Sequence, residues 1–522
     1  MAPQAAAHAG PARGAAAGPS AQRAIPALSG FLCAAVPLSA SGDAAAGRLG
    51  MRARIMKIST LRTLVLLGGL CAGAAAAQAP QSPPVSAERI AAAQARIDEI
   101  RARARHLDAV NELRNLQAIY GYYFDKALWD EVVDLFTENG TMELGTNGVY
   151  VGKARIREYL YSLTGGKPGL RHGELNNHFQ LSPVITVAPD GKTAKARWRA
   201  LIQTGVYGEG SGGNWGAGTY ENEYVREDGV WKISKLHFYT RFYAPYEGGW
   251  TRASPDSALR YGKSPVRPDR PPSVAYRPYP DPFVAPFHFD NPVTSGYVFG
   301  AGVVPPAGNV PRASGRDAPR ATTVAELEAQ VRALELEVER LQAVDEIEHL
   351  ESAYGYYVDK SMQDAIAAMF TENATLEILG RGVFLGRDRI YEYMRRLGAP
   401  QEGALFNHMQ LQPVVHVAPD GNTAQVRSRL FVMYGLLGRN AQWGEGVYEN
   451  VFVKEHGVWK YKNLHGFQTY YTTYEDGWAK RASPMFSPFA GYPPDLPQSV
   501  DYDPYPAVFV PPFHYRHPVT GR

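Results

Sequence analysis

The spacing of apolar positions changes along the chain, and the change predicts the order of the elements. A helix that ends in a tyrosine-rich segment comes first, and apolar residues at intervals of three and four predict another helix after Gly152. Alternation typical of half-buried strands follows in four segments, 181–187, 194–206, 219–226 and 230–243. Pro-Asp-Gly at 189–191 and Glu-Asp-Gly at 227–229 predict hairpins. This order indicates an α+β fold in which helices pack on one face of a curved sheet.

The same pattern occurs twice. Tyr-Gly-Tyr-Tyr-Phe-Asp-Lys at 120–126 returns as Tyr-Gly-Tyr-Tyr-Val-Asp-Lys at 354–360, and Asn-His-Phe-Gln-Leu at 177–181 returns as Asn-His-Met-Gln-Leu at 407–411. The offset between the copies falls from 234 to 230 and then to 228 residues, which indicates two short loop deletions in the second copy. Because each unit is far longer than a solenoid repeat, we interpret the chain as a duplicated domain.

The repeat and the composition divide the chain into seven parts. These are a low-complexity leader with a signal peptide (1–77), a helical lead-in (78–106), domain 1 (107–253), a Pro/Tyr-rich tail and linker (254–322), a second lead-in (323–340), domain 2 (341–482) and a second Pro/Tyr-rich tail (483–522). In the second lead-in, five apolar residues from Leu327 to Leu341 step by four and three, as in a heptad seam. We interpret it as an extended first helix that packs on its own domain, in preference to an intermolecular coiled coil.

The leader resembles an export signal. We take Met51 or Met56 as the true start, because basic residues, an apolar stretch from Leu64 to Ala77 and an Ala-Ala-Ala cleavage site follow. We therefore expect cleavage before Gln78 and export to a bacterial periplasm, with an uncleaved anchor as the alternative. No other segment is long and apolar enough to span a bilayer, so we expect no membrane contact after cleavage.

Charge and cysteine content change once the leader is set aside. The whole chain carries 54 basic and 51 acidic residues, a formal charge of +3. Residues 1–77 hold seven of the basic and one of the acidic side chains, which leaves a formal charge of −3 for the rest. No basic face is visible, so nucleic acid is an unsuitable partner. Both cysteines, Cys33 and Cys71, lie in the leader, which excludes disulfides and thiolate chemistry from the mature chain.

Several motifs in each copy resemble SnoaL-like domains of the nuclear transport factor 2-like superfamily. They are Phe-Thr-Glu-Asn, Gly-x-x-x-Ile, Asn-His, Pro-Asp-Gly-x-Thr-Ala, Gly-x-Tyr-Glu-Asn and Gly-x-Trp-Lys. The resemblance covers 107–250 and 341–478. It implies two tandem cones, each a bent antiparallel sheet closed by helices around an apolar cavity. Members of the superfamily include scytalone dehydratase, ketosteroid isomerase, polyketide cyclases and non-catalytic binders, so the fold does not settle the function.

An aspartate and a histidine in each copy match the catalytic network of dehydratase-like members. Asp125 and Asp359 end the tyrosine-rich helix, where an apolar surrounding would raise the pKa of a carboxyl group toward a useful range. His178 and His408 suit proton transfer near neutral pH. Asn177 and Asn407 precede them and would orient the ring or the substrate. The alternatives are an Asp that pairs with the next lysine or caps the next helix, and a buried His bonded to a backbone carbonyl.

Glu221 and Glu449 are further acid/base candidates, at a place where dehydratase-like members carry a histidine. Strand alternation puts Glu221 on the opposite face from Tyr220 and Asn222, so only one set can line the cavity. The alternative role for Glu221 is an ion pair with Arg197 or Arg199 on a neighbouring strand.

Aromatic residues would bind an aryl or phenol group. The substrate-binding candidates are Tyr120, Tyr123, Trp215, Tyr354, Tyr357 and Trp443. A structural role in the core is equally open for the tyrosines and is favoured for the tryptophans and for His237 and His465. His288 and His514 lie in the repeated Phe-His-(Phe/Tyr) motif of the tails, which suggests a specific docking place at the mouth of a cavity.

The tandem arrangement and the tyrosine-rich motif are similar to bacterial lyases that release formaldehyde from lignin-derived diaryl-propanediols. This resemblance implies a cofactor-independent lyase that loses water through a quinone methide and yields a stilbene. We expect no metal and no organic cofactor, because phosphate-binding, dinucleotide and His-Glu-x-x-His motifs are missing. The alternatives are a dehydratase or isomerase on another hydrophobic cyclic substrate and a non-catalytic aromatic-binding protein. Duplication also allows self-association through sheet faces.

Overall fold

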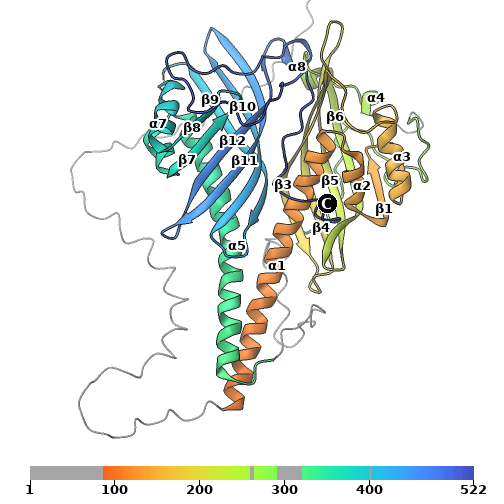
Figure 1. The fold of residues 1–522 in the computed structure, drawn as a ribbon. Coiled ribbons are helices and arrows are strands. Elements are labelled where there is room, and N and C mark those ends of the chain that lie inside the picture. The colour runs from red at the N-terminus through yellow and green to blue at the C-terminus, as the bar shows by residue number, and fades with distance from the viewer. Residues whose placement is uncertain (1–85, 259–263, 291–319, 400) are drawn as a thin grey trace, which may run out of the picture. The chain divides into compact units, whose positions relative to one another are not determined.

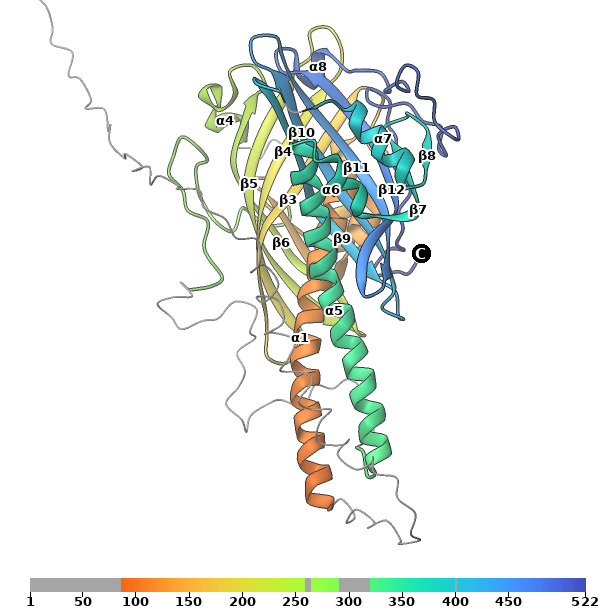
Figure 2. The ribbon, with the colours of Figure 1, turned by 90° about the vertical axis from the view of Figure 1, so that its left-hand side faces the viewer.

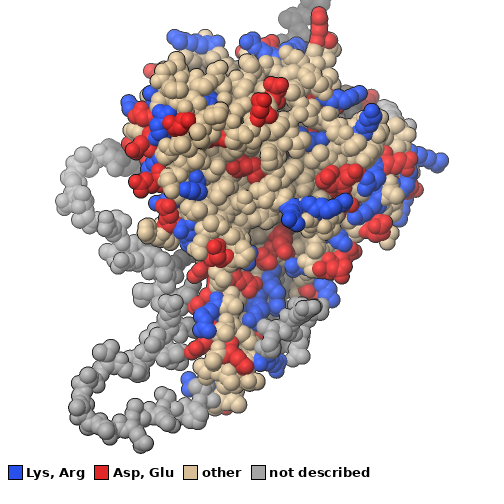
Figure 3. Space-filling view, viewed as in Figure 1, with Lys and Arg blue, Asp and Glu red and all other residues tan. Residues whose placement is uncertain are grey.

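Two six-stranded sheets, one in each repeat, organise the computed structural model (Figure 1). The structure describes residues 86–258, 264–290, 320–399 and 401–522, so the predicted leader lies outside the described residues. Pro83–Arg522 forms one compact unit. None of the helices in the described part of the chain is long and apolar enough to cross a membrane. Lys, Arg, Asp and Glu side chains are interspersed on the face seen in Figure 3.

Domain 1 consists of helices, a curved sheet and a short helical end. Its elements are α1 (Ala87–Asp125), α2 (Trp129–Asp134), β1 (Phe136–Leu144), β2 (Val149–Val151), α3 (Lys153–Leu163), β3 (Glu174–Val187), β4 (Thr193–Val206), β5 (Gly213–Glu227), β6 (Val230–Pro245), the 3-10 turn η3 (Gly249–Arg252) and α4 (Pro255–Ala258). The strand order is β2-β1-β6-β5-β4-β3. The predicted hairpins join β3 to β4 and β5 to β6.

Domain 2 repeats this arrangement. Its elements are α5 (Val324–Asp359), α6 (Gln363–Ala368), β7 (Phe370–Ile378), β8 (Val383–Leu385), α7 (Arg387–Arg396), β9 (Ala404–Val417), β10 (Thr423–Leu436), β11 (Asn440–Glu455), β12 (Val458–Thr473) and α8 (Gly477–Lys480). The strand order, β8-β7-β12-β11-β10-β9, matches that of domain 1. The α+β class and the tandem duplication are thus confirmed.

One strand pair in each sheet departs from the predicted antiparallel arrangement. β1 runs parallel to β6, and β7 runs parallel to β12. These partners are the first and last long strands of a domain, so no hairpin joins them and the long intervening chain allows a parallel pairing. The sheets are therefore mixed and open, with β2 and β3 or β8 and β9 at their edges.

The long first helices of the two domains lie side by side (Figures 1 and 2). The heptad seam of α5 contributes Leu334, which packs with Ile97 and Ala104 of α1. Gln94 and Arg101 of α1 also donate hydrogen bonds to Gln330 of α5. The apolar seam of α5 therefore packs against α1 of the other domain. The expectation that this seam packs on its own domain was wrong.

The Pro/Tyr-rich tails dock on the sheets at equivalent places. Glu143 accepts hydrogen bonds from the backbone N–H and the hydroxyl of Ser273, and Glu377 accepts the same pair from Ser499. The second tail then continues onto domain 1, where Phe513 joins the periphery of its core. The tails thus have a defined place, as the repeated tail motif predicts.

The glycine of the tyrosine-rich motif allows α1 to lie directly on β3 and on the second domain. A Cβ atom at Gly121 would lie 2.6 Å from Gln412 Nε2, 2.8 Å from Gln180 Cγ and 3.1 Å from the carbonyl oxygen of His178. Gln412 is fixed in this place, because its amide donates to the Ala118 carbonyl and accepts from the Gln180 N–H. Neither the His178 backbone nor the Gln412 amide can move away from a side chain at position 121 without losing hydrogen bonds.

Gly121→Ala should therefore lower the free energy of unfolding by about 1–3 kcal/mol, although alanine is the better helix former. Urea unfolding of the full chain measures the loss. Gly212→Ala is the matched control, because a Cβ atom there meets nothing within 4 Å. Equal stability of the two variants would show that the approach of α1 to the second domain is loose.

Candidate functional site

Side chains on the inner face of each sheet face the helices and form the candidate site. In β3, His178 and Gln180 point inward, as do His408 and Gln410 in β9. Each histidine is tied to the end of the first helix, since its backbone N–H donates to Asp125 or Asp359 at 2.6 Å. The aspartates and histidines are therefore brought together in both domains.

In domain 1 the aspartate is sealed by the other domain. The guanidinium of Arg429, from β10, pairs with Asp125 and, at 2.7 Å, with Glu445. All three side chains are buried. Burial raises the pKa of Asp125 to about 6, even though Arg429 and the His178 N–H stabilise the charged form. Asp125 thus joins the two domains, a role that neither reading of the sequence included.

His178 is a neutral imidazole at physiological pH. Burial, together with the nearby Arg429 charge, lowers its pKa to about 3. Its Nδ1 lies 4.0 Å from Asp125 Oδ1, too far for a hydrogen bond, and this nitrogen has no partner. The Phe124 ring covers the imidazole at 4.6 Å. The proton-transfer role predicted for His178 thus has no connected partner in this conformation.

Domain 2 carries a continuous line of hydrogen-bonding groups across its interior. Tyr448 and His408 Nε2 are 3.1 Å apart, and His408 Nδ1 lies 3.2 Å from the Gln410 amide. The Ser428 hydroxyl is within hydrogen-bond reach of both Gln410, at 3.4 Å, and Glu351, at 3.2 Å. The line ends at the buried carboxyl group of Glu351. It thus connects an acid, Glu351, to a base, His408, through the neutral side chains of Ser428 and Gln410.

Glu351 is the functional candidate that the motifs did not reveal. Burial raises its pKa to about 7, against hydrogen bonds from Asn450 and Ser428. Burial also lowers the pKa of His408 to about 4. Near neutral pH the pair thus holds a carboxylic acid and a neutral imidazole. The repeat offset of 234 places Gln117 opposite Glu351, and this single exchange was a signal available in the sequence.

The interior of domain 1 has no acid at this place. Gln117 bonds there with Gln180 at 2.8 Å, Asn222 at 3.0 Å and Tyr224 at 2.7 Å. Three buried aromatic residues of domain 1 are replaced in domain 2 by smaller residues: Trp198 by Ser428, Phe238 by Gly466 and Phe124 by Val358. Three rings are gained in domain 2, where Tyr461 replaces Ile233, Phe406 replaces Asn176 and Tyr434 replaces Thr204. The two interiors therefore differ in where their rings lie.

Glu221 and Glu449 lie on the outer face of the sheets, away from the histidines. Glu221 forms an ion pair with Arg197, which is the alternative role considered from the sequence. Its carboxylate also lies 2.8 Å from His288 Nδ1. Glu449 pairs with Arg427 and with His514 at 2.7 Å in the same way. The inner set is therefore Tyr220 and Asn222 with their counterparts, and the tail histidines hold the tails to the sheet.

The aromatic candidates divide between the interior and the surfaces. Tyr120 and Tyr354 are buried inside, and burial raises the pKa of both hydroxyls. Tyr123 points to the second tail, where it stacks on His517, and Trp215 and Trp443 pack together where the two domains meet. Asn177 faces Gln203 on the outer side. The remaining predicted residues, Tyr357, Asn407, His237 and His465, are not part of the hydrogen-bonded line in domain 2.

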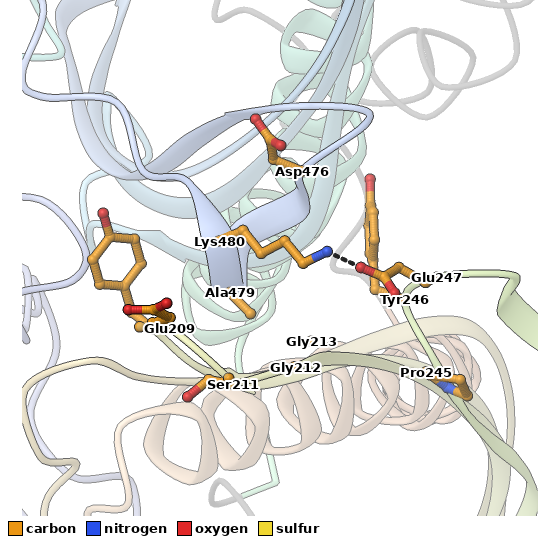
Figure 4. Close-up of a pocket in the computed structure, with 13 residues that line it drawn as sticks. Glu209, Ser211, Gly212, Gly213, Pro245, Tyr246, Glu247, Asp476, Ala479 and Lys480 are labelled. Atoms are coloured by element: carbon orange, nitrogen blue, oxygen red, sulfur yellow. Dashed lines mark hydrogen bonds and ion pairs between the residues drawn. The ribbon is translucent and has the colours of Figure 1, made fainter.

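A separate hollow of about 620 Å³ lies between the β4–β5 turn and α8 (Figure 4). Its rim carries the ion pair of Lys480 with Glu247. These side chains and Glu209 are exposed, so solvent screens their charges. It contains none of the predicted site residues. Among the described residues no group of three or more His, Cys, Asp or Glu side chains could hold a metal ion.

Comparisons with known proteins agree with this architecture. The model of the SnoaL-like domain family matches residues 105–237 and 339–465. Two SnoaL-like domains stand in tandem in this chain. A search of curated proteins gave no match.

Solved structures similar to one domain include a putative scytalone dehydratase from Novosphingobium aromaticivorans, with 22% identity over 29% of this chain and 95% of that one (TM-score 0.25). A hexachlorocyclohexane dehydrochlorinase, LinA type 2, has 21% identity over 26% and 92% (TM-score 0.24). ActVI-ORFA from Streptomyces coelicolor has 14% over 24% and 97% (TM-score 0.23). These values carry no conclusion about activity.

Arg429→Met should be strongly destabilising, because it leaves Asp125 and Glu445 as buried carboxylates without a counter-charge. Breaking a buried ion pair from one side costs about 3–5 kcal/mol. Arg199→Met is the matched control, since Arg199 occupies the equivalent place in domain 1 and is exposed. Urea unfolding of both variants in dilute solution makes the comparison. An equal, small loss in the two would show that the domain joint does not depend on this arginine.

Proposed function

We propose that this chain is a cofactor-independent enzyme acting on a hydrophobic cyclic substrate, and that domain 2 carries the chemistry. The observation that supports this most is the connected line from Glu351 to Tyr448. It offers an acid and a base that share one apolar interior, while domain 1 has Gln117 at the place of the acid. The two SnoaL-like domains are in keeping with such a role without fixing it.

The protonation states decide which residue gives and which takes a proton. Glu351, with a pKa of about 7, is a general acid near neutral pH, and His408, with a pKa of about 4, is a neutral general base. For His408 to act as the base, its hydrogen lies on Nδ1 and the Gln410 amide presents its oxygen there. Nε2 is then free to accept a proton, which the neighbouring Tyr448 hydroxyl would relay from the substrate. Each such group typically contributes about 10²–10⁴-fold to a rate.

The substrate class that we propose is a phenolic, lignin-derived diaryl-propanediol. Glu351 protonates the benzylic hydroxyl, and the phenol oxygen, reacting as its phenolate, supplies the electrons that expel water and form a quinone methide. His408, through Tyr448, then takes the proton of the terminal hydroxyl. The adjacent C–C bond breaks, its electron pair restores the aromatic ring and forms the stilbene double bond, and formaldehyde leaves. Substrate therefore gives stilbene, formaldehyde and water, with no oxidant or reductant. The buried tyrosines near His408 support this choice.

The assay incubates the full chain with an erythro diaryl-propanediol that carries free phenols and follows formaldehyde and stilbene together. We expect both products in equal amounts, with EDTA without effect. Glu351→Gln and His408→Ala should each lower kcat/KM by about 10²–10³-fold. Gln117→Glu and His178→Ala are the matched controls in domain 1 and should retain activity. Water loss without a one-carbon product would support a dehydratase instead, and turnover unaffected by His408→Ala would refute the site.

The pH dependence of kcat/KM should be bell-shaped. Activity rises as His408 loses its proton above a pH of about 4 and falls as Glu351 loses its proton above a pH of about 7. In Glu351→Gln the alkaline limb near pH 7 should disappear along with most of the activity, since glutamine does not titrate. If the residual activity of this variant still declines near pH 7, the decline is due to the titration of a group other than Glu351.

A further inference from the structure

The two domains meet through different surfaces, which makes their interface heterologous. Domain 1 contributes a surface that we call its helix face, made of Tyr122, Tyr123, Asp125 and Leu175. Domain 2 contributes a surface that we call its tail face, made of Arg429, Trp478, Tyr505 and Phe513. Since the chain is a duplication, each repeat has both faces in its sequence, and one of each is left over.

The two unused faces expose large apolar side chains. Trp250 in domain 1 is 59% exposed, whereas its counterpart Trp478 is 0% exposed. In domain 2, Tyr356 is 72% exposed, and its counterpart Tyr122 only 2%. Leu405 is 57% exposed, against 4% for the equivalent Leu175. Clusters of this kind on a soluble protein mark interaction sites.

The free tail face of domain 1, defined as Arg199, Trp250, Tyr279 and Phe287, is already built. Tyr279 N–H donates to the Arg241 carbonyl at 2.8 Å, as Tyr505 N–H does to Thr469. A hollow of about 180 Å³ opens beside Phe287. It is lined by Arg197, whose counterpart Arg427 has the Tyr122 ring at 4.7 Å from its guanidinium carbon. The hollow is thus a preformed place for a tyrosine such as Tyr356.

Charge on the free helix face of domain 2, defined as Tyr356, Tyr357, Asp359 and Leu405, matches the free tail face of domain 1. Asp125 has the Arg429 counter-charge, while Asp359, at the equivalent place, forms no ion pair in the described structure. Arg199, the counterpart of Arg429, is exposed and forms none there either. Arg199 and Asp359 therefore occupy the positions that Arg429 and Asp125 occupy in the ion pair between the domains, but neither has a partner of opposite charge in the described structure.

We infer that the free tail face of one copy docks on the free helix face of a second copy, and that Arg199 of the first copy pairs with Asp359 of the second. Asp359 holds the His408 backbone, so Arg199 of the first copy acts as a positioning residue for the site in domain 2 of the second copy. Ser182 stands where Gln412 bridges the domains within the chain. The contact between copies thus lacks this bridge and is the weaker of the two.

The test is sedimentation of the full chain over a concentration series. We expect species of two or more chains for the unaltered protein, and monomers, with at least tenfold weaker association, for Trp250→Glu and for Tyr356→Glu. Each variant keeps one face intact, so an equimolar mixture should restore a species of two chains. A symmetric, self-complementary contact would not be rescued by mixing. Arg199→Glu and Asp359→Arg form a second pair with the same logic, should either aromatic variant misfold.

Leu385→Glu is the matched control, because Leu385 is exposed and lies in β8, at the opposite edge of the sheet from β9. It should associate like the unaltered chain. The inference is overturned if the unaltered chain is a monomer at all concentrations, if the face variants associate normally, or if mixing fails to restore association. The readout is mass, so this outcome is independent of whether the proposed enzyme activity is found.

Discussion

One buried arginine determines how the repeats relate to each other. Arg429 leaves the outer face of the domain 2 sheet and meets a carboxylate at the end of the first helix of domain 1, and both side chains are buried. A guanidinium in such a joint is stable only while its acids are present, because an unpaired buried charge is costly. The Asp125 carboxylate in turn holds the backbone of His178. Domain contact and candidate site are therefore linked in domain 1.

The linkage explains how two copies of one fold could take different roles. Domain 1 uses its aspartate to bind its neighbour, and its interior is filled by Trp198 and a network of neutral amides around Gln117. Domain 2 keeps the aspartate outside this joint, replaces the tryptophan by Ser428 and gains a carboxyl group, Glu351. We propose that the first copy became a support and that the second kept the chemistry.

Much of this could be predicted from sequence, within limits that have physical causes. The duplication and the α+β class follow from local motifs and strand periodicity, and the resemblance to dehydratase-like members implies that Asp125 and His178 belong together. Alternation showed that Glu221 and Tyr220 face opposite sides, but a period of two does not say which side is the interior. Only the contact of Glu221 with Arg197 and His288 decides it. The parallel β1–β6 pair carries no local signal, because its partners are distant in sequence.

Arg429 and Glu351 escaped the motif analysis for different reasons. Arg429 stands at the same position of the repeat as Arg199, and its role arises only because domain 1 covers it. Glu351 belongs to no motif, yet it replaces Gln117 three residues before the repeated tyrosine-rich segment. Comparing two repeats for exchanged charges is therefore more informative here than searching either repeat for known patterns.

The central claim, that the interior of domain 2 alone receives the substrate, can be tested by calorimetric titration of the full chain with a dihydroxystilbene. We expect one molecule bound per chain. Ser428→Trp, which gives domain 2 the tryptophan of domain 1, should abolish binding, and His178→Ala should leave it intact. Two molecules per chain, or binding that survives Ser428→Trp, would contradict the division of roles between the domains.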